Sequence, residues 1–189
     1  MTREFLRLFI AIKLDDQAII DKITRLQHDL LTAKLRAKYV EPENLHITLK
    51  FIGEVPPEVA ERIAKSLREI QGNQFEIEFY GIGAFPSLSR PRVLWIGVRS
   101  GASQLETLAE SIETTLSRRA RIKRSEKSFH PHLTIARVKG RLTLDARKIL
   151  EAHKEDIFGQ IKAREFLLMK STLTPRGPIY NVVEKYELI

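Results

Sequence analysis

Apolar and polar residues alternate along most of the chain, with a period of either two or three to four positions. A period of two predicts β-strands, here near residues 5–14, 45–53, 74–84, 92–98, 131–138, 160–173 and 179–188. Helical spacing predicts helices from Asp15 or Asp16 to about residue 35 and over residues 56–70, 102–119 and 143–157. The order of these elements lacks the steady strand–helix–strand rhythm of a parallel sheet. It therefore favours an α+β fold with largely antiparallel sheets flanked by helices.

The pattern repeats itself after 86 residues. The segments His46-Ile47-Thr48-Leu49 and His132-Leu133-Thr134-Ile135 are the clearest pair, and apolar positions in the preceding helices match at the same offset. A long period with two copies indicates two related lobes rather than a solenoid. We predict one bilobal domain over residues 1–189, with an internal repeat of about 1–86 and 87–172 related by a pseudo-two-fold axis, and a C-terminal strand segment, 173–189.

Composition narrows the possible classes of protein. The chain has 189 residues, a formal net charge of +8 and no cysteine, which excludes disulfides, thiolate zinc sites and a cysteine nucleophile. No apolar run approaches the roughly 20 residues that a membrane-spanning helix needs. Residues 1–5 lack the layout of a signal peptide. We therefore expect a cytoplasmic protein without a membrane partner.

Basic residues gather in front of both histidine motifs. One segment contains Arg36, and the other, residues 118–124, contains Arg121. Such segments suit a groove that follows the phosphates of a polynucleotide. The simpler alternative is that these basic segments are solvated surface and that the protein has no nucleic-acid partner.

The two motifs suggest acid–base chemistry at phosphorus. In a strand, His46 and Thr48 share one face, as do His132 and Thr134. Imidazole titrates near neutral pH, so one ring can accept a proton while the other donates one. Two hydroxyls can bind the non-bridging oxygens of a phosphate. This set of groups suits in-line displacement without a metal or other cofactor.

The residues around both motifs resemble those of a known family. Residues 45–55, His130 to Arg137, and the strands at 7–11 and 92–97 strongly resemble the two-histidine phosphoesterases, and within them the RNA 2',3'-cyclic phosphodiesterases (ThpR/LigT), once called 2'-5' RNA ligases. The resemblance implies a bilobal α+β fold with a central active-site cleft. It also implies hydrolysis of a 2',3'-cyclic phosphate to a 2'-phosphomonoester, with His46 as proton donor and His132 as proton acceptor.

Several further residues are candidates for substrate contact. The resemblance implies that Arg137 contacts phosphate, although strict alternation places it opposite His132, so the strand must end or bulge before it. Lys50 shares the parity of His46 and is expected to reach phosphate or solvent. Phe129 is a candidate for stacking on a base, and Trp95 is expected in packing. His130 lacks a histidine counterpart at position 44, so we expect no metal site there.

Three functions remain compatible with these residues. The first is the metal-independent RNA cyclic phosphodiesterase, whose partner is RNA with a 2',3'-cyclic phosphate end, for example a tRNA fragment. The second is a 2'-5' RNA ligase that joins such an end to a 5'-hydroxyl. The third is a non-catalytic module that binds RNA ends. We expect a monomer in each case.

Overall fold

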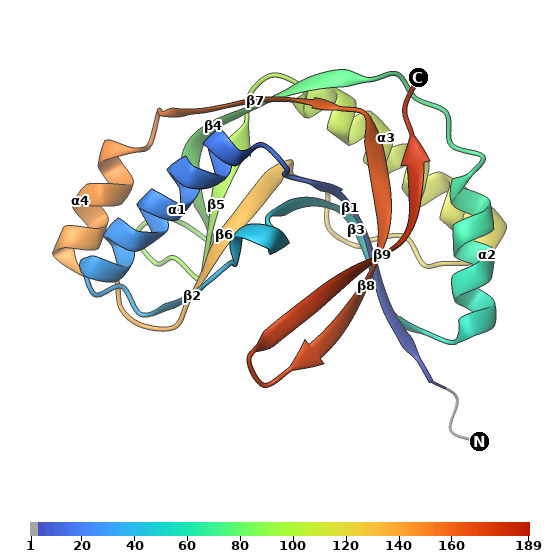
Figure 1. Cartoon of the computed structure of the whole chain (residues 1–189), viewed down its shortest axis with the longest axis horizontal. Coiled ribbons are helices and arrows are strands. Elements are labelled where there is room, and N and C mark those ends of the chain that lie inside the picture. Colours follow the sequence, from blue (N-terminus) through green and yellow to red (C-terminus); the bar gives the residue numbers. More distant parts are fainter. Residues whose placement is uncertain (1–3) are drawn as a thin grey trace.

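The computed structural model describes residues 4–189 of the chain (Figure 1). Its strands are β1 (Leu6–Lys13), β2 (Ala37–Tyr39), β3 (His46–Val55), β4 (Phe75–Phe85), β5 (Val93–Val98), β6 (His132–Val138), β7 (Ile157–Ala163), β8 (Glu165–Thr174) and β9 (Gly177–Glu187). Its α-helices are α1 (Gln17–Thr32), α2 (Pro57–Leu67), α3 (Ala102–Thr115) and α4 (Leu144–Ala152). Residues 1–3, part of the segment on which the absence of a signal peptide was predicted, lie outside the described residues. None of the helices in residues 4–189 is long and apolar enough to cross a membrane.

The strands described in residues 4–189 form one antiparallel sheet of nine strands. Its order is β7-β4-β5-β6-β3-β1-β8-β9, and β2 pairs with residues 136–138 of β6 on the edge opposite β5. The helices form two groups, α1 with α4 and α2 with α3, which lie over different halves of the sheet (Figure 1). The main core fills the space between these helices and one face of the sheet. The predicted α+β class and the antiparallel pairing are thus confirmed.

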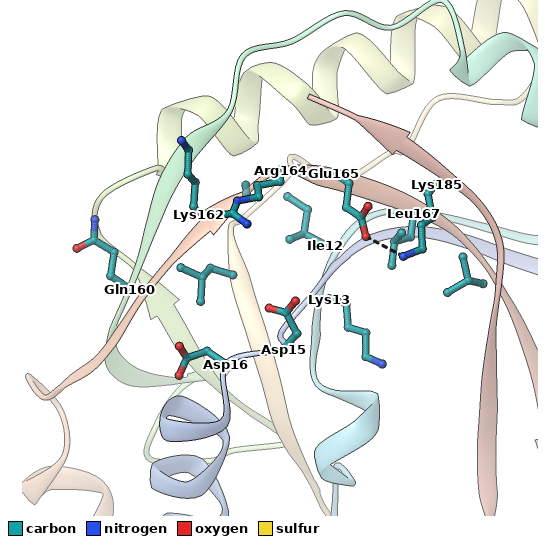
Figure 2. A pocket seen from close by; sticks show the side chains of 13 residues that line it. Ile12, Lys13, Asp15, Asp16, Gln160, Lys162, Arg164, Glu165, Leu167 and Lys185 are labelled. Atoms are coloured by element: carbon teal, nitrogen blue, oxygen red, sulfur yellow. Dashed lines mark hydrogen bonds and ion pairs between the residues drawn. The ribbon is translucent and has the colours of Figure 1, made fainter. Parts of the chain in front are cut away.

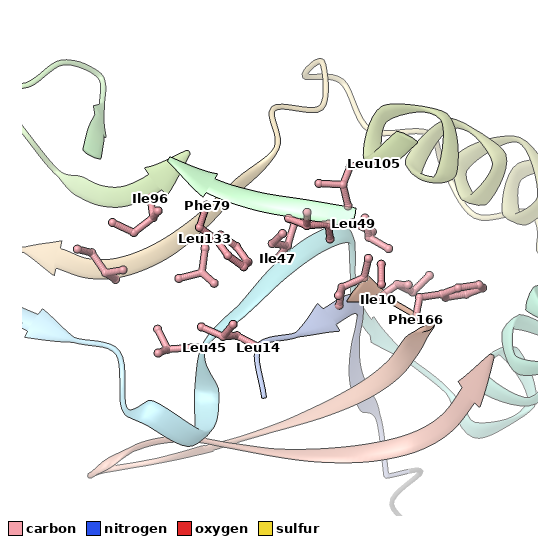
Figure 3. Packing of buried hydrophobic residues seen from close by; sticks show 14 of the residues in the cluster. Ile10, Leu14, Leu45, Ile47, Leu49, Phe79, Ile96, Leu105, Leu133 and Phe166 are labelled. Atoms are coloured by element: carbon pink, nitrogen blue, oxygen red, sulfur yellow. The ribbon is translucent and has the colours of Figure 1, made fainter. Parts of the chain in front are cut away.

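The two halves of the sequence exchange strands. β4, from the first half, pairs with β5 of the second half, while β8, from the second half, pairs with β1 of the first. The halves of the sheet meet where Ile47 pairs with Leu133 (Figure 3). Each lobe in space therefore contains segments from both halves of the sequence.

Two predicted elements near the C-terminus are wrong in extent. The helix expected over 143–157 ends at Ala152, because residues 153–156 form a turn and Ile157 begins β7. The single strand expected over 160–173 is two strands that separate at Arg164. The chain turns there because β7 pairs with β4 in one half of the sheet, whereas β8 pairs with β1 in the other. The short strand β2 was not predicted.

Both histidine strands contain a bulge at the same position of the motif. The pairing register skips Leu49 between β3 and β1, and it skips Ile135 between β6 and β5. One extra residue reverses the alternation beyond it. Lys50 and Ala136 therefore turn to the buried side of the sheet, while Arg137 is exposed. The strand was expected to end or bulge before Arg137; it bulges, and β3 carries an equivalent bulge.

Candidate active site

His46 lies at the start of β3 and is held by its backbone neighbourhood. Its Nδ1 lies 2.6 Å from the carbonyl oxygen of Asn44, and its Nε2 lies 3.0 Å from Thr48 Oγ1. The carbonyl can only accept, so Nδ1 carries a hydrogen and Nε2 is the atom left for proton transfer. The rings of Phe9 and Tyr180 pack 5.1 and 5.4 Å from the imidazole centre. Burial lowers the pKa of His46 below its usual value. The hydrogen bond to the Asn44 carbonyl partly offsets this effect, and the charges of His132 and Arg137 lower the pKa further.

His132 repeats this arrangement at the start of β6. Its Nδ1 lies 2.5 Å from the carbonyl oxygen of His130, which again leaves Nε2 for chemistry. The rings of Phe85 and Trp95 pack 5.0 and 6.1 Å from its centre. Burial is the main cause of the lowered pKa of His132. The hydrogen bond to the His130 carbonyl acts against it, and the charges of His130 and Arg137 lower the pKa further.

The register at the middle of the sheet relates the two motifs. Because Ile47 pairs with Leu133 in antiparallel fashion, His46 and His132 lie on opposite sides of this pair, each beside the threonine of the other strand. Both motifs project from the face opposite the main core, which we call the histidine face. Two imidazoles whose Nε2 atoms are not held by the backbone and two threonine hydroxyls thus lie on one surface. The arrangement can hold an anion and move protons on both of its sides.

Arg137 supplies positive charge on the histidine face. Its guanidinium lies close enough to lower the pKa of both His46 and His132, and it acts in the same direction on Tyr180. An exposed arginine beside two imidazoles is suited to binding a phosphate oxygen. The equivalent residue of β3 is Phe51, 54% exposed, whose ring lies 4.8 Å from the guanidinium carbon of Arg7.

The expectation that Lys50 reaches phosphate or solvent is wrong. After the bulge its side chain points into the protein and is 3% exposed. Its Nζ lies 2.8 Å from a carboxylate oxygen of Glu113 on α3, and it also donates to Ser125 and to the carbonyl of Lys123. Lys50 therefore ties β3 to the helix layer, away from the histidine face.

The remaining candidates lie outside the pair of motifs. Phe129 is half-buried and packs against the main core. Arg36 and Arg121 are both exposed, the first after α1 and the second after α3, so they belong to different lobes. The His130 carbonyl accepts from His132 Nδ1, and the His130 ring packs at an angle against Trp95 and edge-on against Phe85. Among residues 4–189, no group of three His, Asp or Glu side chains is placed to hold a metal ion.

The aromatic rings beside the histidines were largely missed by sequence reasoning. Phe9 and Trp95 occupy equivalent strands, whereas Tyr180 reaches His46 through the β8–β9 hairpin and leaves no signal near either motif. The expected packing role of Trp95 agrees with its contacts. A side chain at Gly83 would meet the indole ring at 2.1 Å, so glycine is needed there.

A groove of about 720 Å³ lies beside His46, although neither motif lines it. It includes Lys13, which pairs with His46 in the β1–β3 register, and it reaches the corner between β7 and β8 (Figure 2). Both signs of charge line it. The cations are those of Lys13, Lys162, Arg164 and Lys185, and the carboxylates are those of Asp15, Asp16 and Glu165. Glu165 pairs with Lys185 at 3.4 Å, and Asp16 caps α1 by accepting from the amide of Ile19.

Known proteins match both the sequence and the fold. The family model described as LigT like Phosphoesterase matches residues 12–95 and again residues 96–180. The RNA 2',3'-cyclic phosphodiesterase of Archaeoglobus fulgidus is 41% identical over 182 residues, 96% of this chain and 100% of that protein. The protein of the same name from Aquifex aeolicus is 39% identical over 157 residues, 82% and 84% of the two chains. The crystal structure of E. coli LigT complexed with 3'-AMP has a TM-score of 0.77 at 26% identity and covers 98% and 99%.

The chain belongs to the LigT-like phosphoesterase family, the two-histidine class that the motifs predicted. The relatives named above carry the name RNA 2',3'-cyclic phosphodiesterase, and they match nearly the whole chain or more than four-fifths of it. The resemblance inferred from the two motifs is therefore confirmed.

Proposed function

We propose that this protein is an enzyme that hydrolyses the 2',3'-cyclic phosphate at the end of an RNA to a 2'-phosphomonoester. The observation that carries the proposal is the matched pair of imidazoles, each with Nδ1 fixed by a backbone carbonyl and Nε2 left for proton transfer on the histidine face. The relatives' shared name supports the same substrate class. A module that only binds RNA ends would not need two histidines oriented in this way.

The reaction follows from the roles of the two rings. His132 Nε2 accepts a proton from water, whose oxygen forms a bond to phosphorus on the side opposite the leaving group. The bond from phosphorus to the 3'-oxygen breaks, and protonated His46 gives its Nε2 proton to that oxygen. Thr48 and Thr134 donate to the non-bridging oxygens, and Arg137 balances their charge. Solvent then returns both imidazoles to their starting protonation states.

Other expectations belong to the same proposal. The reaction uses no metal or cofactor, the enzyme acts as a cytoplasmic monomer, and tRNA fragments are among its substrates. The double match of the family model supports the proposed internal duplication, because one family description fits residues 12–95 and 96–180 in turn. The groove at Lys13 is lined by both cationic and anionic side chains, which suits a polar substrate rather than an apolar one.

Phosphorus NMR on a defined substrate tests the proposal. An oligonucleotide with a 2',3'-cyclic phosphate end is incubated with the enzyme and a chelator, with and without a second strand that has a 5'-hydroxyl. We expect conversion to a 2'-phosphomonoester in both reactions. A 2'-5' joined product would instead identify a ligase, and an unchanged substrate would identify a binding module. The His46→Ala variant serves as the inactive control.

A further inference from the structure

A second pocket, of about 480 Å³, is lined by basic residues and contains no carboxylate. Its lining residues belong to the β4–β5 loop, the end of β6, the segment that leads into α4, and α4 itself. Its cationic side chains are those of Arg90, Arg92, Lys139, Arg141 and Arg147. All five are exposed. This lining differs from the groove at Lys13, where three carboxylates accompany four cations.

The five cations have no acidic partners within the described part of the chain. None of them takes part in an ion pair. The basic segment at 118–124 is different, because Arg119 pairs with Glu69 and Arg124 pairs with Glu110. Unpaired like charges repel one another, so a pocket of this kind favours an anionic ligand.

Backbone hydrogen bonds fix the loops that carry these side chains. The amide of Val138 donates to the carbonyl of Arg92 at 2.9 Å, and the amides of Lys139 and Gly140 donate to the carbonyl of Arg36 at 2.8 and 3.1 Å. A side chain at Gly140 would approach Arg36 Cβ to 2.9 Å, so the two segments touch. Arg36, expected from the sequence to contact RNA, thus adds a sixth cation at the border of the pocket.

The pocket adjoins the end of the histidine face where Arg137 lies. Val138, which lines the pocket, directly follows Arg137, and Arg92 precedes Val93, the partner of Arg137 on β5. A 2',3'-cyclic phosphate occupies the 3' end of an RNA, so the rest of the chain lies on its 5' side. The backbone of any longer substrate must therefore leave the site in one direction.

We propose that this pocket binds backbone phosphates of the RNA on the 5' side of the reacting nucleotide. This inference rests on the proposed function and adds to it the place where the RNA backbone beyond the reacting nucleotide is bound. The contacts are to phosphates, so they bind RNA of any sequence and weaken as salt increases. The position of the pocket beyond Arg137 separates this binding from the chemistry at His46 and His132.

The test compares two doubly substituted proteins of equal net charge. One carries Arg90→Gln and Arg141→Gln in the pocket, and the control carries Lys65→Gln and Lys148→Gln, which are exposed and outside it. Fluorescence anisotropy measures the affinity of each protein for a fluorescently labelled single-stranded RNA of about ten nucleotides, at a series of salt concentrations. Turnover of a 2',3'-cyclic mononucleotide is measured in parallel.

We expect the pocket variant to bind the RNA about tenfold more weakly at low salt and to lose about 1.4 from the slope of log affinity against log salt. Its turnover of the cyclic mononucleotide should equal that of the unsubstituted protein. Equal weakening in the control variant would overturn the proposal, because net charge alone would then explain binding. A parallel loss of mononucleotide turnover would also overturn it. If the unsubstituted protein hydrolyses neither the cyclic mononucleotide nor an oligonucleotide with a 2',3'-cyclic phosphate end, the proposed function fails, while RNA binding still decides the role of the pocket.

Discussion

Ile47 and Leu133 pair at the junction of β3 and β6, and both side chains are almost completely buried. They are 86 positions apart, so they occupy equivalent places in the two motifs. The pseudo-two-fold axis that relates the motifs must pass between them. This pair, the register contact that joins β3 to β6, therefore helps to set the relative position of the two imidazoles.

Shortening a side chain at the junction should destabilise the fold. Leu133→Ala leaves a cavity at a position that is 0% exposed, and we expect a loss of about 2–5 kcal/mol in the free energy of unfolding. Urea denaturation measures this loss. Leu144→Ala is the control, since Leu144 is 77% exposed and should change stability by less than about 0.5 kcal/mol. Similar midpoints for the two variants would show that the junction is not tightly packed.

Removing the cation of Lys50 should reduce stability more than it affects the chemistry. Lys50→Met leaves the Glu113 carboxylate without its buried partner, which costs about 3–5 kcal/mol. The double variant Lys50→Met, Glu113→Leu should recover a large part of this loss. Calorimetry of both variants measures the difference, and no recovery in the double variant would argue against a paired role.

The ion pair between Lys50 and Glu113 should also make the free energy of unfolding depend on pH. Burial, the largest single influence, raises the pKa of Glu113, but hydrogen bonds from Lys50 and Ser125 outweigh it and lower the pKa below the usual value. The stabilisation is therefore present above the unfolded-state pKa and is lost as the pH falls through the folded-state value. Unfolding curves between about pH 3 and 7 should show this loss in the unsubstituted protein and a smaller one in the double variant.

The threonines should act on the bound phosphate through their hydroxyls. Thr→Val at position 48 or 134 preserves shape and removes one donor, so each change should raise the activation free energy by about 1–3 kcal/mol. Values of kcat/KM for a cyclic-phosphate substrate measure the effect. Thr172→Val is an exposed control in β8 and should leave turnover unchanged. Full activity of both motif variants would mean that the threonines serve only the strands.

The lowered histidine pKa values predict where the pH optimum lies. Activity needs one neutral and one protonated imidazole, a state whose population is greatest between the two apparent pKa values of the pair. Burial lowers the pKa of both rings below 6.5, so the bell-shaped profile of kcat/KM should peak below pH 6.5. Arg137→Gln removes a charge that lowers both values, and the peak should move upward. A downward move, or a peak well above pH 6.5 in the unsubstituted protein, would contradict this assignment.

The local pattern of the sequence predicted the elements that carry the site. His46, Thr48, His132 and Thr134 alternate with buried residues as expected, and Asp16 caps α1 as one of its two candidate residues. The bulge before Arg137 was expected because a family resemblance required that residue on the histidine face. The equivalent bulge at Leu49 was not foreseen, and the position of Lys50 was therefore predicted wrongly.

The missed features depend on pairing between distant segments. The exchange of β4 and β8 between the sequence halves follows from sheet order, which local periodicity does not encode. Tyr180 reaches His46 only because β9 folds back along β8. The separation of β7 from β8 at Arg164 has the same origin, since both strands have strand-like sequence and differ only in their partners.

The most direct test of the central claim measures single-turnover hydrolysis of an oligonucleotide with a 2',3'-cyclic phosphate end by three variants. His46→Ala and His132→Ala each remove one proton-transfer group, whereas His153→Ala removes a histidine that pairs with Asp156 far from the motifs. The account predicts a fall of at least about a hundredfold for each motif variant and normal turnover for His153→Ala. Near-normal turnover by a folded His46→Ala or His132→Ala protein would contradict catalysis by the histidine pair.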